Sequence, residues 1–295
     1  MNGIINVLKP PGMTSSNVVV YLRKLLKVPK VGHTGTLDPQ AVGVLPICIG
    51  KATKLSDFLM SDRKTYIGEL TLGVKTDTLD VEGRVISSKP VKCNIENIEE
   101  AFKVFSGDIE QIPPVYSAIK YKGQKLYKLA REGIEVSMPP REITIYKNEI
   151  IKYYPPDKVF FKVECSKGTY IRSLCRDIGD YLGCGAYMSF LMRSQSGYFD
   201  ISHSYTLDEI EKYYKNGAIE SFLIPMDLSL IKLKSIYISS KVYNKLLNGN
   251  AVYVDFIDNK QDIVYNEYVK VYCKGQFIGV GIFKDDCLKM KNVLL

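Results

Sequence analysis

The sequence predicts an α+β protein, in which a large mixed domain is followed by a small β-rich domain. Three observations favour this class. Segments with helical and strand periodicity are interspersed in the first part of the chain, without regular βαβ alternation. The last part contains mostly short strand-like segments and one helical segment. Between these parts, residues 224–230 (IPMDLSL) have the character of a connector, so we predict domains over residues 1–229 and 230–295.

Sequence periodicity predicts the main elements of the large domain in chain order. The expected elements are a helix from a cap at Ser15 or Ser16 to about Lys27, a strand over 65–74, a helix over 94–105, and strands over 141–151 and 158–166. The last strand has apolar residues at every second position, which is typical of a strand with one buried face. These residues are Val159, Phe161, Val163 and Cys165.

Capping signals mark two further helices. Thr206 and Glu209 form a T-x-x-E capping box ahead of an apolar stripe. In the small domain, a helix over 240–247 is closed by Asn248-Gly249. The remaining segments of this domain alternate like the short strands of a small barrel.

The composition is that of a folded protein without a membrane span. The 295 residues are 46% hydrophobic and 24% charged, which is ordinary for a globular protein. No apolar run approaches the roughly 18 residues that a spanning helix needs. The first ten residues lack the basic and apolar regions of a secretory signal. We therefore expect a cytoplasmic protein.

Positive charge is concentrated towards the C-terminal end of the chain. Residues 230–295 contain ten lysines and six acidic residues, so this short part carries half of the net charge of +8. Such a charge attracts polyanions in a salt-dependent way. Because solubility alone accounts for many basic proteins, composition leaves nucleic-acid binding and simple solvation as equal alternatives.

Cysteine and histidine usage restricts the possible chemistry. The seven cysteines are odd in number and form no CxxC pair, which argues against a disulfide framework and a zinc ribbon. His33 and His203 are the two histidines of the chain, so a histidine-rich metal site is excluded. Catalysis would therefore depend on carboxylates and hydroxyls without a metal.

The segment 31–46 (VGHTGTLDPQAVGVLP) is the most unusual part of the chain. Three glycines and two prolines interrupt it too often for a helix or a central strand, so we predict a structured loop that presents Asp38. Proline at the next position favours extended backbone at Asp38 and fixes the direction of its carboxylate. Two interpretations remain open from this segment alone: a catalytic carboxylate, and an Asx turn, which is the more common arrangement.

Five blocks of the sequence occur in the order that is typical of one enzyme family. They are NVLKPPGMTSSNVV (6–19), GHTGTLDP followed by GVLP (32–46), KTYIGELTLGVKTDTLDVEG (64–83), GDIEQIPPVYSAIKYKGQKLYKLAREGIEV (107–136) and SKGTYIRSLCRDIGDYLGCGAY (166–187). Leu191 and Arg193 follow the last block. Together the blocks span nearly all of the first 193 residues, and they closely resemble the motifs of the TruB family of pseudouridine synthases.

This resemblance implies both a fold and a reaction. The fold would be that of pseudouridine synthases, with a mixed, largely antiparallel sheet, followed by a C-terminal PUA-like RNA-binding domain, for which the match is looser. The reaction would be isomerisation of uridine to pseudouridine in the T-loop of tRNA (position 55), with Asp38 as the catalytic carboxylate. No cofactor or metal is expected, because nothing is oxidised or hydrolysed. The expected partner is the T-arm stem-loop of tRNA, and we expect a monomer that needs no protein partner.

The resemblance also assigns roles to further residues. Arg172 would pair with the catalytic aspartate. Tyr66 would stack on the flipped uracil with its hydroxyl near C5, and Tyr170 would line the same pocket. Leu191 would form an apolar wall against the base. His33 would stack in the RNA, in the gap that the flipped nucleotides leave.

Several questions remain open from the sequence. Phosphate contacts are expected from lysines in or beside the matched blocks, without a choice among Lys9, Lys51, Lys54, Lys64, Lys120 and Lys122. Gln40 and Val42 depart conservatively from the family pattern. The alternatives are an RNA-binding protein without catalysis and a guide-dependent enzyme for ribosomal RNA. The second is disfavoured because the chain lacks the long extensions of dyskerin-type relatives. A metal-dependent hydrolase is disfavoured by the scarcity of histidine.

Overall fold

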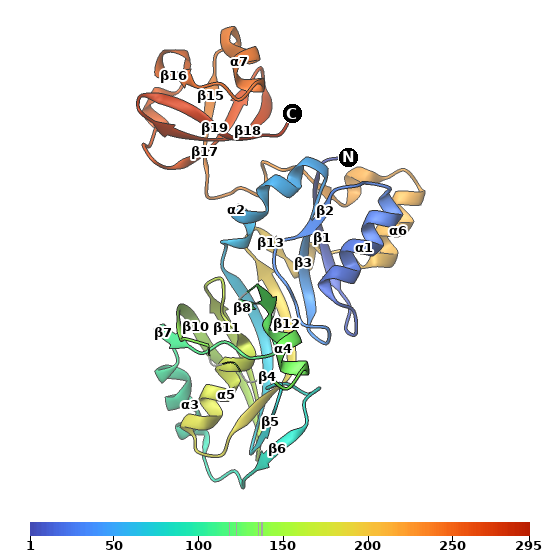
Figure 1. Ribbon diagram of the computed structural model, residues 1–295, viewed down its shortest axis with the longest axis vertical. Coiled ribbons are helices and arrows are strands. Elements are labelled where there is room, and N and C mark those ends of the chain that lie inside the picture. The colour runs from blue at the N-terminus through green and yellow to red at the C-terminus, as the bar shows by residue number, and fades with distance from the viewer. Residues whose placement is uncertain (118, 122, 135, 137) are drawn as a thin grey trace.

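The computed structural model describes the chain except for residues 118, 122, 135 and 137. Figure 1 shows a large domain built around one long sheet, with a smaller, separate β domain at one end, beside the N-terminus. Among the lysines considered above, Lys122 lies outside the described residues, and the side chain of Lys120 is also not described.

The large sheet is mixed and mostly antiparallel. Its order is β14-β1-β3-β12-β4-β11-β10-β7, and its only parallel pair within the described residues is that of β12 with β3. The strands are β1 (Gly3–Lys9), β3 (Val42–Ile49), β4 (Lys64–Leu72), β7 (Gly107–Gln111), β10 (Arg141–Tyr154), β11 (Lys158–Cys165), β12 (Ala186–Ser196) and β14 (Leu223–Ile224). The short β2 (Val31–His33) and β13 (Phe199–Asp200) pair with β3 and β12.

The predicted alternation of the strand over 158–166 is confirmed. Its four apolar residues are fully buried in β11, whereas Lys162 between them is exposed. On the neighbouring β4, Gly68 lies so close to the ring of Phe161 that an added Cβ would approach ring atoms to 2.6 Å. The sheet is thus packed tightly at its centre, where β4 and β11 lie side by side.

The helices that cover the sheet are α1 (Ser15–Leu26), α2 (Ser56–Met60), α3 (Ile95–Val104), α4 (Leu126–Arg131), α5 (Ile171–Tyr181) and α6 (Leu207–Lys215). Of these, α1, α3 and α6 begin at side-chain caps. The predicted cap of α1 was wrong, because Thr14, rather than Ser15 or Ser16, accepts a hydrogen bond from the Asn17 amide. Ser15 instead turns inward. Within the described residues, none of the helices has the length and apolar composition to traverse a bilayer.

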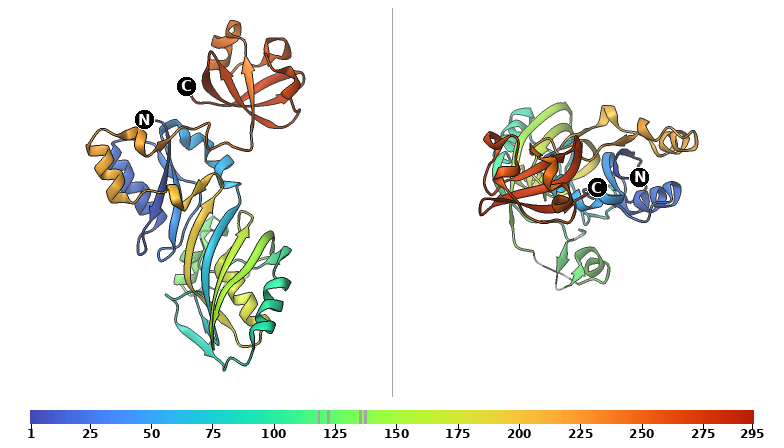
Figure 2. Two further views of the ribbon diagram at one scale, coloured as in Figure 1. Left: turned by 180° about the vertical axis from the view of Figure 1, so that it is seen from behind. Right: turned by 90° about the horizontal axis from the view of Figure 1, so that it is seen from above.

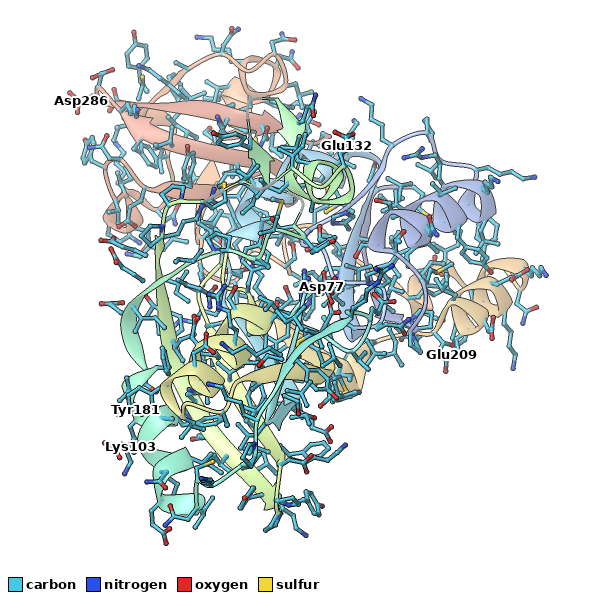
Figure 3. All side chains as sticks on the ribbon, turned by 60° about the horizontal axis from the view of Figure 1, so that its bottom comes forward. Asp77, Lys103, Glu132, Tyr181, Glu209 and Asp286 are labelled. Atoms are coloured by element: carbon cyan, nitrogen blue, oxygen red, sulfur yellow. The ribbon has the colours of Figure 1, made fainter. Side chains whose placement is uncertain are left out.

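The capping box predicted at Thr206 is confirmed. The Thr206 hydroxyl accepts from the Glu209 amide, and the Glu209 carboxylate accepts from the Thr206 amide at 2.8 Å. Figure 3 shows Glu209 on the outer side of α6, at the edge of the molecule. Tyr181 and Lys103 mark the ends of α5 and α3 in the same view, where Tyr181 meets Phe105 edge-to-face at 6.1 Å.

The prediction that residues 31–46 form a loop was wrong at both ends. Val31–His33 form β2, and Val42–Ile49 form β3 in the middle of the sheet, so the loop covers only residues 34–41. Pro46 has no N–H and therefore needs no acceptor, and its carbonyl accepts from the Thr34 amide at 3.1 Å. At Gly43 (φ 105°), an added Cβ would lie 2.3 Å from the carbonyl oxygen of Arg193, so only glycine allows β3 to approach β12.

The small domain is a five-stranded sheet with its own core. The strand order is β15-β17-β18-β19-β16, with β15 (Lys234–Ile238), β16 (Val252–Tyr253), β17 (Tyr268–Cys273), β18 (Gln276–Lys284) and β19 (Cys287–Val293). The helix predicted over 240–247 begins as a 3₁₀ turn, and α7 covers only Tyr243–Leu247. Asp286 lies in the turn between β18 and β19, at the outer edge of this domain (Figure 3).

The two domains share an apolar contact that fixes their relative position. The cluster combines residues of the large domain with residues of the connector and the small domain: Ile4, Val44, Cys48, Leu55, Phe199, Leu230, Val280 and Leu294. Polar bonds surround it, because Lys54 Nζ donates to the Val293 carbonyl at 3.1 Å and Lys232 pairs with Asp62 at 2.7 Å. Figure 2 shows the last strand and the C-terminus turned towards the large domain.

Candidate active site

Asp38 lies in a loop that neighbouring side chains hold from several directions. The Nζ of the fully buried Lys9 donates to the carbonyls of Pro39 and Ala41 at 2.9 and 2.8 Å. The Ser15 hydroxyl accepts from the Leu37 amide at 2.8 Å and donates to the carbonyl of the same residue. These bonds hold the loop backbone without using the Asp38 carboxylate, which is therefore available for another partner.

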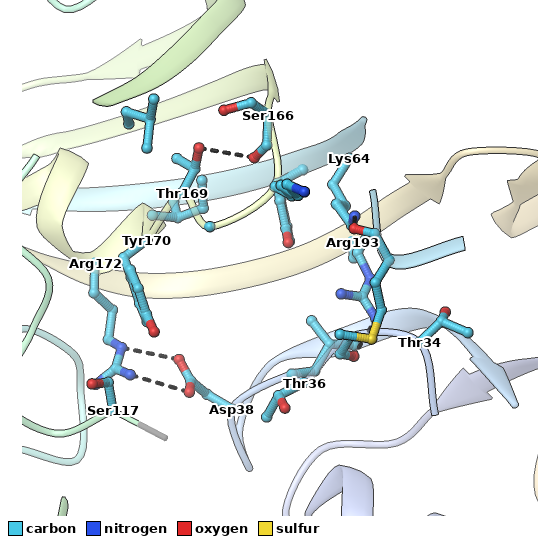
Figure 4. A pocket seen from close by; sticks show the side chains of 18 of the residues that line it. Thr34, Thr36, Asp38, Lys64, Ser117, Ser166, Thr169, Tyr170, Arg172 and Arg193 are labelled. Atoms are coloured by element: carbon cyan, nitrogen blue, oxygen red, sulfur yellow. Dashed lines mark hydrogen bonds and ion pairs between the residues drawn. The ribbon is translucent and has the colours of Figure 1, made fainter. Parts of the chain in front are cut away.

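That partner is Arg172, at the start of α5. Its Nε lies 2.9 Å from Oδ2 of Asp38, and its Nη2 lies 3.1 Å from Oδ1, which makes a two-point pair (Figure 4). The side chain of Arg172 is 6% exposed and that of Asp38 is 35% exposed. The guanidinium is thus buried behind the carboxylate, and the carboxylate faces the open side. The two-point pair fixes the plane of the Asp38 carboxylate as well as its position.

A second carboxylate contacts the same guanidinium. Oδ2 of the buried Asp80 lies 3.4 Å from Nη1 of Arg172, and the Asp80 side chain is held by the Thr78 hydroxyl and the Glu82 amide. The sequence reasoning missed this residue, although it lies inside the third matched block, in the turn TDTLDVEG. Arg172 therefore shares its charge between two aspartates.

A cavity of about 750 Å³ opens in front of Asp38. Tyr66 of β4, Leu191 of β12 and Tyr170, which immediately precedes α5, line it together with Asp38 and Arg172. Five of the six predicted site residues are thus brought to one cavity, although they are up to 153 positions apart in the sequence. Such a volume is within the range of sites for small ligands, including a single nucleoside.

Comparisons with known proteins agree with this arrangement. A family model described as TruB family pseudouridylate synthase (N terminal domain) matches residues 23–171, and one described as tRNA pseudouridylate synthase B C-terminal domain matches residues 172–231. The chain belongs to the TruB family. The tRNA pseudouridine synthase B of Alkaliphilus oremlandii is 47% identical over 99% of this chain and 97% of that protein. That of Clostridium kluyveri is 45% identical over 100% of both chains.

Solved structures confirm the predicted fold. A chain from the "Crystal Structure of a Cbf5-Nop10-Gar1 Complex" has a TM-score of 0.77 and 28% identity, with 99% of this chain and 85% of that chain covered. One from the "Structure of H/ACA RNP bound to a substrate RNA containing 2'-deoxyuridine" has a TM-score of 0.76 and 25% identity, with the same coverage. Membership of the TruB family also confirms the predicted enzyme class: the chain is a tRNA pseudouridine synthase, an isomerase.

Burial changes the acidity of the residues in this TruB family site. It raises the pKa of the Asp38 carboxyl; Asp80 and Glu82 raise it further, whereas Arg172 opposes the change. Burial also raises the pKa of the Tyr66 and Tyr170 phenols. Both tyrosines are therefore neutral at physiological pH, and the pKa of Asp38 lies above its ordinary value.

The structure places His33 outside the cavity. It ends β2 and is half-buried, and its Nδ1 accepts from the Gly35 amide at 3.3 Å. Burial lowers the pKa of the imidazole, and the charge of Arg193 lowers it further, so His33 is neutral. A neutral ring at the edge of the loop suits stacking rather than pairing with phosphate.

Two of the lysines in the matched blocks have internal roles. Lys9 supports the Asp38 loop, and Lys64 donates to the carbonyls of Met60 and Asp62 from a buried position. Burial lowers the pKa of each ammonium to about 8. Lys51 and Lys54 are exposed and donate to carbonyls at the C-terminus. A contact of Lys9 or Lys64 with phosphate would break the bonds that these two lysines donate to backbone carbonyls.

Proposed function

We propose that this TruB family enzyme isomerises the uridine at position 55 in the T-loop of tRNA, with Asp38 as the catalytic carboxylate. The observation that carries the proposal is the two-point pair of Asp38 with the buried Arg172, at the wall of a cavity that fits one nucleoside. The pair holds a negative charge at a fixed place and leaves its open side towards the ligand.

The reaction requires a carboxylate at the sugar. The bond between uracil N1 and ribose C1′ breaks, uracil turns, and a bond between C5 and C1′ forms before the C5 proton leaves. Asp38 either attacks C1′ directly or supports loss of a C2′ proton to give a glycal, and both routes need its ionised form. Because no group is oxidised or hydrolysed, the reaction needs no cofactor.

The walls of the cavity suit a flipped base. The ring of Tyr66 and the side chain of Leu191 provide apolar surfaces from neighbouring strands, and Tyr170 closes the side towards Arg172. Extruding a uridine from an RNA loop costs a few kcal/mol, which stacking against these side chains offsets. His33, outside the cavity, would then occupy the gap that the flipped nucleotides leave in the RNA.

The small domain would contact RNA beyond the loop. Its concentration of lysines favours phosphate binding, and its fixed contact with the large domain keeps it at one distance from the cavity. We place the domain boundary between residues 229 and 230, within the connector from β14 to β15. We propose a monomer that works without a protein partner in the cytoplasm, where free thiols such as those of the seven cysteines persist.

Tritium release from a defined RNA tests this proposal. A T-arm stem-loop tritiated at C5 of the target uridine is mixed with purified protein without added metal or cofactor. We expect release of one tritium per RNA, and none when the label is carried by uridines of the stem. Absence of release from the T-loop label, with RNA binding intact, would overturn the proposed substrate.

As the pH is lowered, activity should begin to fall at a higher pH than it would with an aspartate of ordinary pKa. Only ionised Asp38 is active, and its pKa lies above the ordinary value of 3.8. Activity is therefore full above the raised pKa and falls about tenfold per pH unit below it. Single-turnover rates are measured from about pH 4 to about pH 8, with RNA binding measured in parallel. They locate the acidic limb of the pH–rate profile, which is the pH range over which the rate falls. A midpoint at or below the ordinary value, with binding constant, would contradict the expected environment of Asp38.

A further inference from the structure

We propose that Arg193 is a positioning residue that stabilises the phenolate of Tyr66 when Tyr66 accepts the C5 proton of uracil. This inference rests on the proposed function and adds a residue to its last chemical step. No role for Arg193 follows from the pairing of Asp38 with Arg172, because Arg193 belongs to a different part of the cavity wall.

The backbone places Arg193 directly beside Tyr66. The two residues are opposite each other in the antiparallel pair of β12 with β4. Both line the cavity, and Figure 4 shows the Arg193 guanidinium beside Lys64, apart from the Asp38–Arg172 pair. Nε of Arg193 donates to the Val44 carbonyl at 2.7 Å, and Nη2 donates to the Gly35 carbonyl at 3.0 Å. The guanidinium is thereby fixed between β3 and the loop that carries Asp38.

The charge of Arg193 lacks an anionic partner. The residue is 1% exposed, and within the described part of the chain it forms no ion pair with a carboxylate. A buried guanidinium that is paired only with carbonyls carries an uncompensated charge, and this charge would stabilise an anion that forms beside it. Tyr66 is the ionisable group across the strand pair, and its phenolate would be that anion.

The opposing influences on Tyr66 fit this role. Burial raises the pKa of the phenol, and the charge of Arg193 opposes this change. Lys64, the other cation at this wall, has a pKa lowered to about 8 by burial and by Arg193, and its ammonium donates to the carbonyls of Met60 and Asp62. Arg193 would act on the proton transfer only through Tyr66.

The step balances without a further reactant. During the reaction the Tyr66 phenol, which is neutral in the free enzyme, transfers its proton to water, and the charge of the neighbouring Arg193 stabilises the phenolate that forms. After C5 has bonded to C1′, the phenolate oxygen takes the C5 proton. The electron pair of the C5–H bond forms the C5–C6 double bond, and the pair of the N1–C6 double bond returns to N1. N1 then takes a proton from water, so the total number of protons is unchanged.

Isotope effects distinguish this role from a merely structural one. Single-turnover rates are measured with T-arm RNA carrying hydrogen or deuterium at C5 of the target uridine. In Arg193→Met we expect a rate about 10²-fold lower and a C5 isotope effect larger than in the wild type, because proton removal becomes limiting. Arg193→Lys should restore part of the rate and lower the isotope effect. The matched control Arg141→Met removes an exposed arginine at the cavity rim and should weaken RNA binding without changing the isotope effect.

A double variant completes the test. In a Tyr66→Phe background, Arg193→Met should cause no further loss, because both substitutions affect one step. Independent losses in the double variant, or an unchanged isotope effect in Arg193→Met, would overturn the proposal. If the melting temperature shows that Arg193→Met does not fold, the test rests on Arg193→Lys. A lower rate in Arg193→Lys with an unchanged isotope effect would also overturn the proposal. Inactivity of the wild type on this RNA would instead overturn the proposed function, and this inference with it.

Discussion

Asp38→Asn should abolish pseudouridine formation while leaving RNA binding intact. The amide has nearly the size of the carboxylate, but it has no charge and is a far weaker nucleophile. We expect the single-turnover rate to fall by about 10⁴-fold or more. The rate is measured by tritium release from the T-arm stem-loop, and the affinity by filter binding of the same RNA.

The control for this variant is a second aspartate at the same cavity. Asp57 borders the cavity but forms no ion pair within the described residues. Asp57→Asn should therefore change the rate only a few-fold. Equal losses in both variants would indicate a general effect of charge in the cavity, and near-normal activity in Asp38→Asn would exclude Asp38 as the catalytic carboxylate.

Removing Arg172 should have the second largest effect. Arg172→Met leaves Asp38 and Asp80 without their shared cation, and breaking such a buried pair costs about 3–5 kcal/mol of stability. An equal loss of transition-state stabilisation would lower the rate roughly 10²–10⁴-fold. Loss of the guanidinium also raises the pKa of Asp38 further, so the acidic limb of the pH–rate profile should move to higher pH. Arg172→Lys should be intermediate, because one ammonium cannot pair with both carboxylate oxygens.

The matched control for Arg172 lies one helical turn further along α5. Arg176 is partly exposed and pairs with Asp177 at 2.8 Å, away from Asp38. Arg176→Met should leave the position of the pH limb unchanged. A loss of rate in Arg172→Met without a shift of the limb would show that Arg172 supports the fold of the site rather than the charge of Asp38.

Local patterns were sufficient to predict much of the fold. Alternating apolar residues identified β11, and the capping box of Thr206 and Glu209 identified the start of α6, because both signals depend on neighbours within a few positions. The α1 cap, predicted at Ser15 or Ser16, was misplaced by one or two residues, since Thr14 is also a capping type and only tertiary contacts turn Ser15 towards Leu37.

Contacts between distant segments account for what the sequence did not reveal. Pro46 argued against a central strand, but the Thr34 amide bonds its carbonyl and Gly43 admits the backbone of β12, which no local pattern indicates. Asp80 and Arg193 stand in or beside matched blocks without any local sign of a role. The contact of Asp80 with Arg172 spans 92 positions in the sequence, so only the folded chain brings it to the site.

Mapping pseudouridine in cellular tRNA tests the role of Asp38 and the identity of the substrate together. A bacterial strain that lacks the T-loop modification would express either the wild-type chain or Asp38→Asn at equal protein levels, and pseudouridine would be located at single-nucleotide resolution in its tRNA. We expect the wild type to restore pseudouridine at position 55 and Asp38→Asn to restore none. Pseudouridine at position 55 in the Asp38→Asn strain, or modification by the wild type at other sites only, would contradict the assignment.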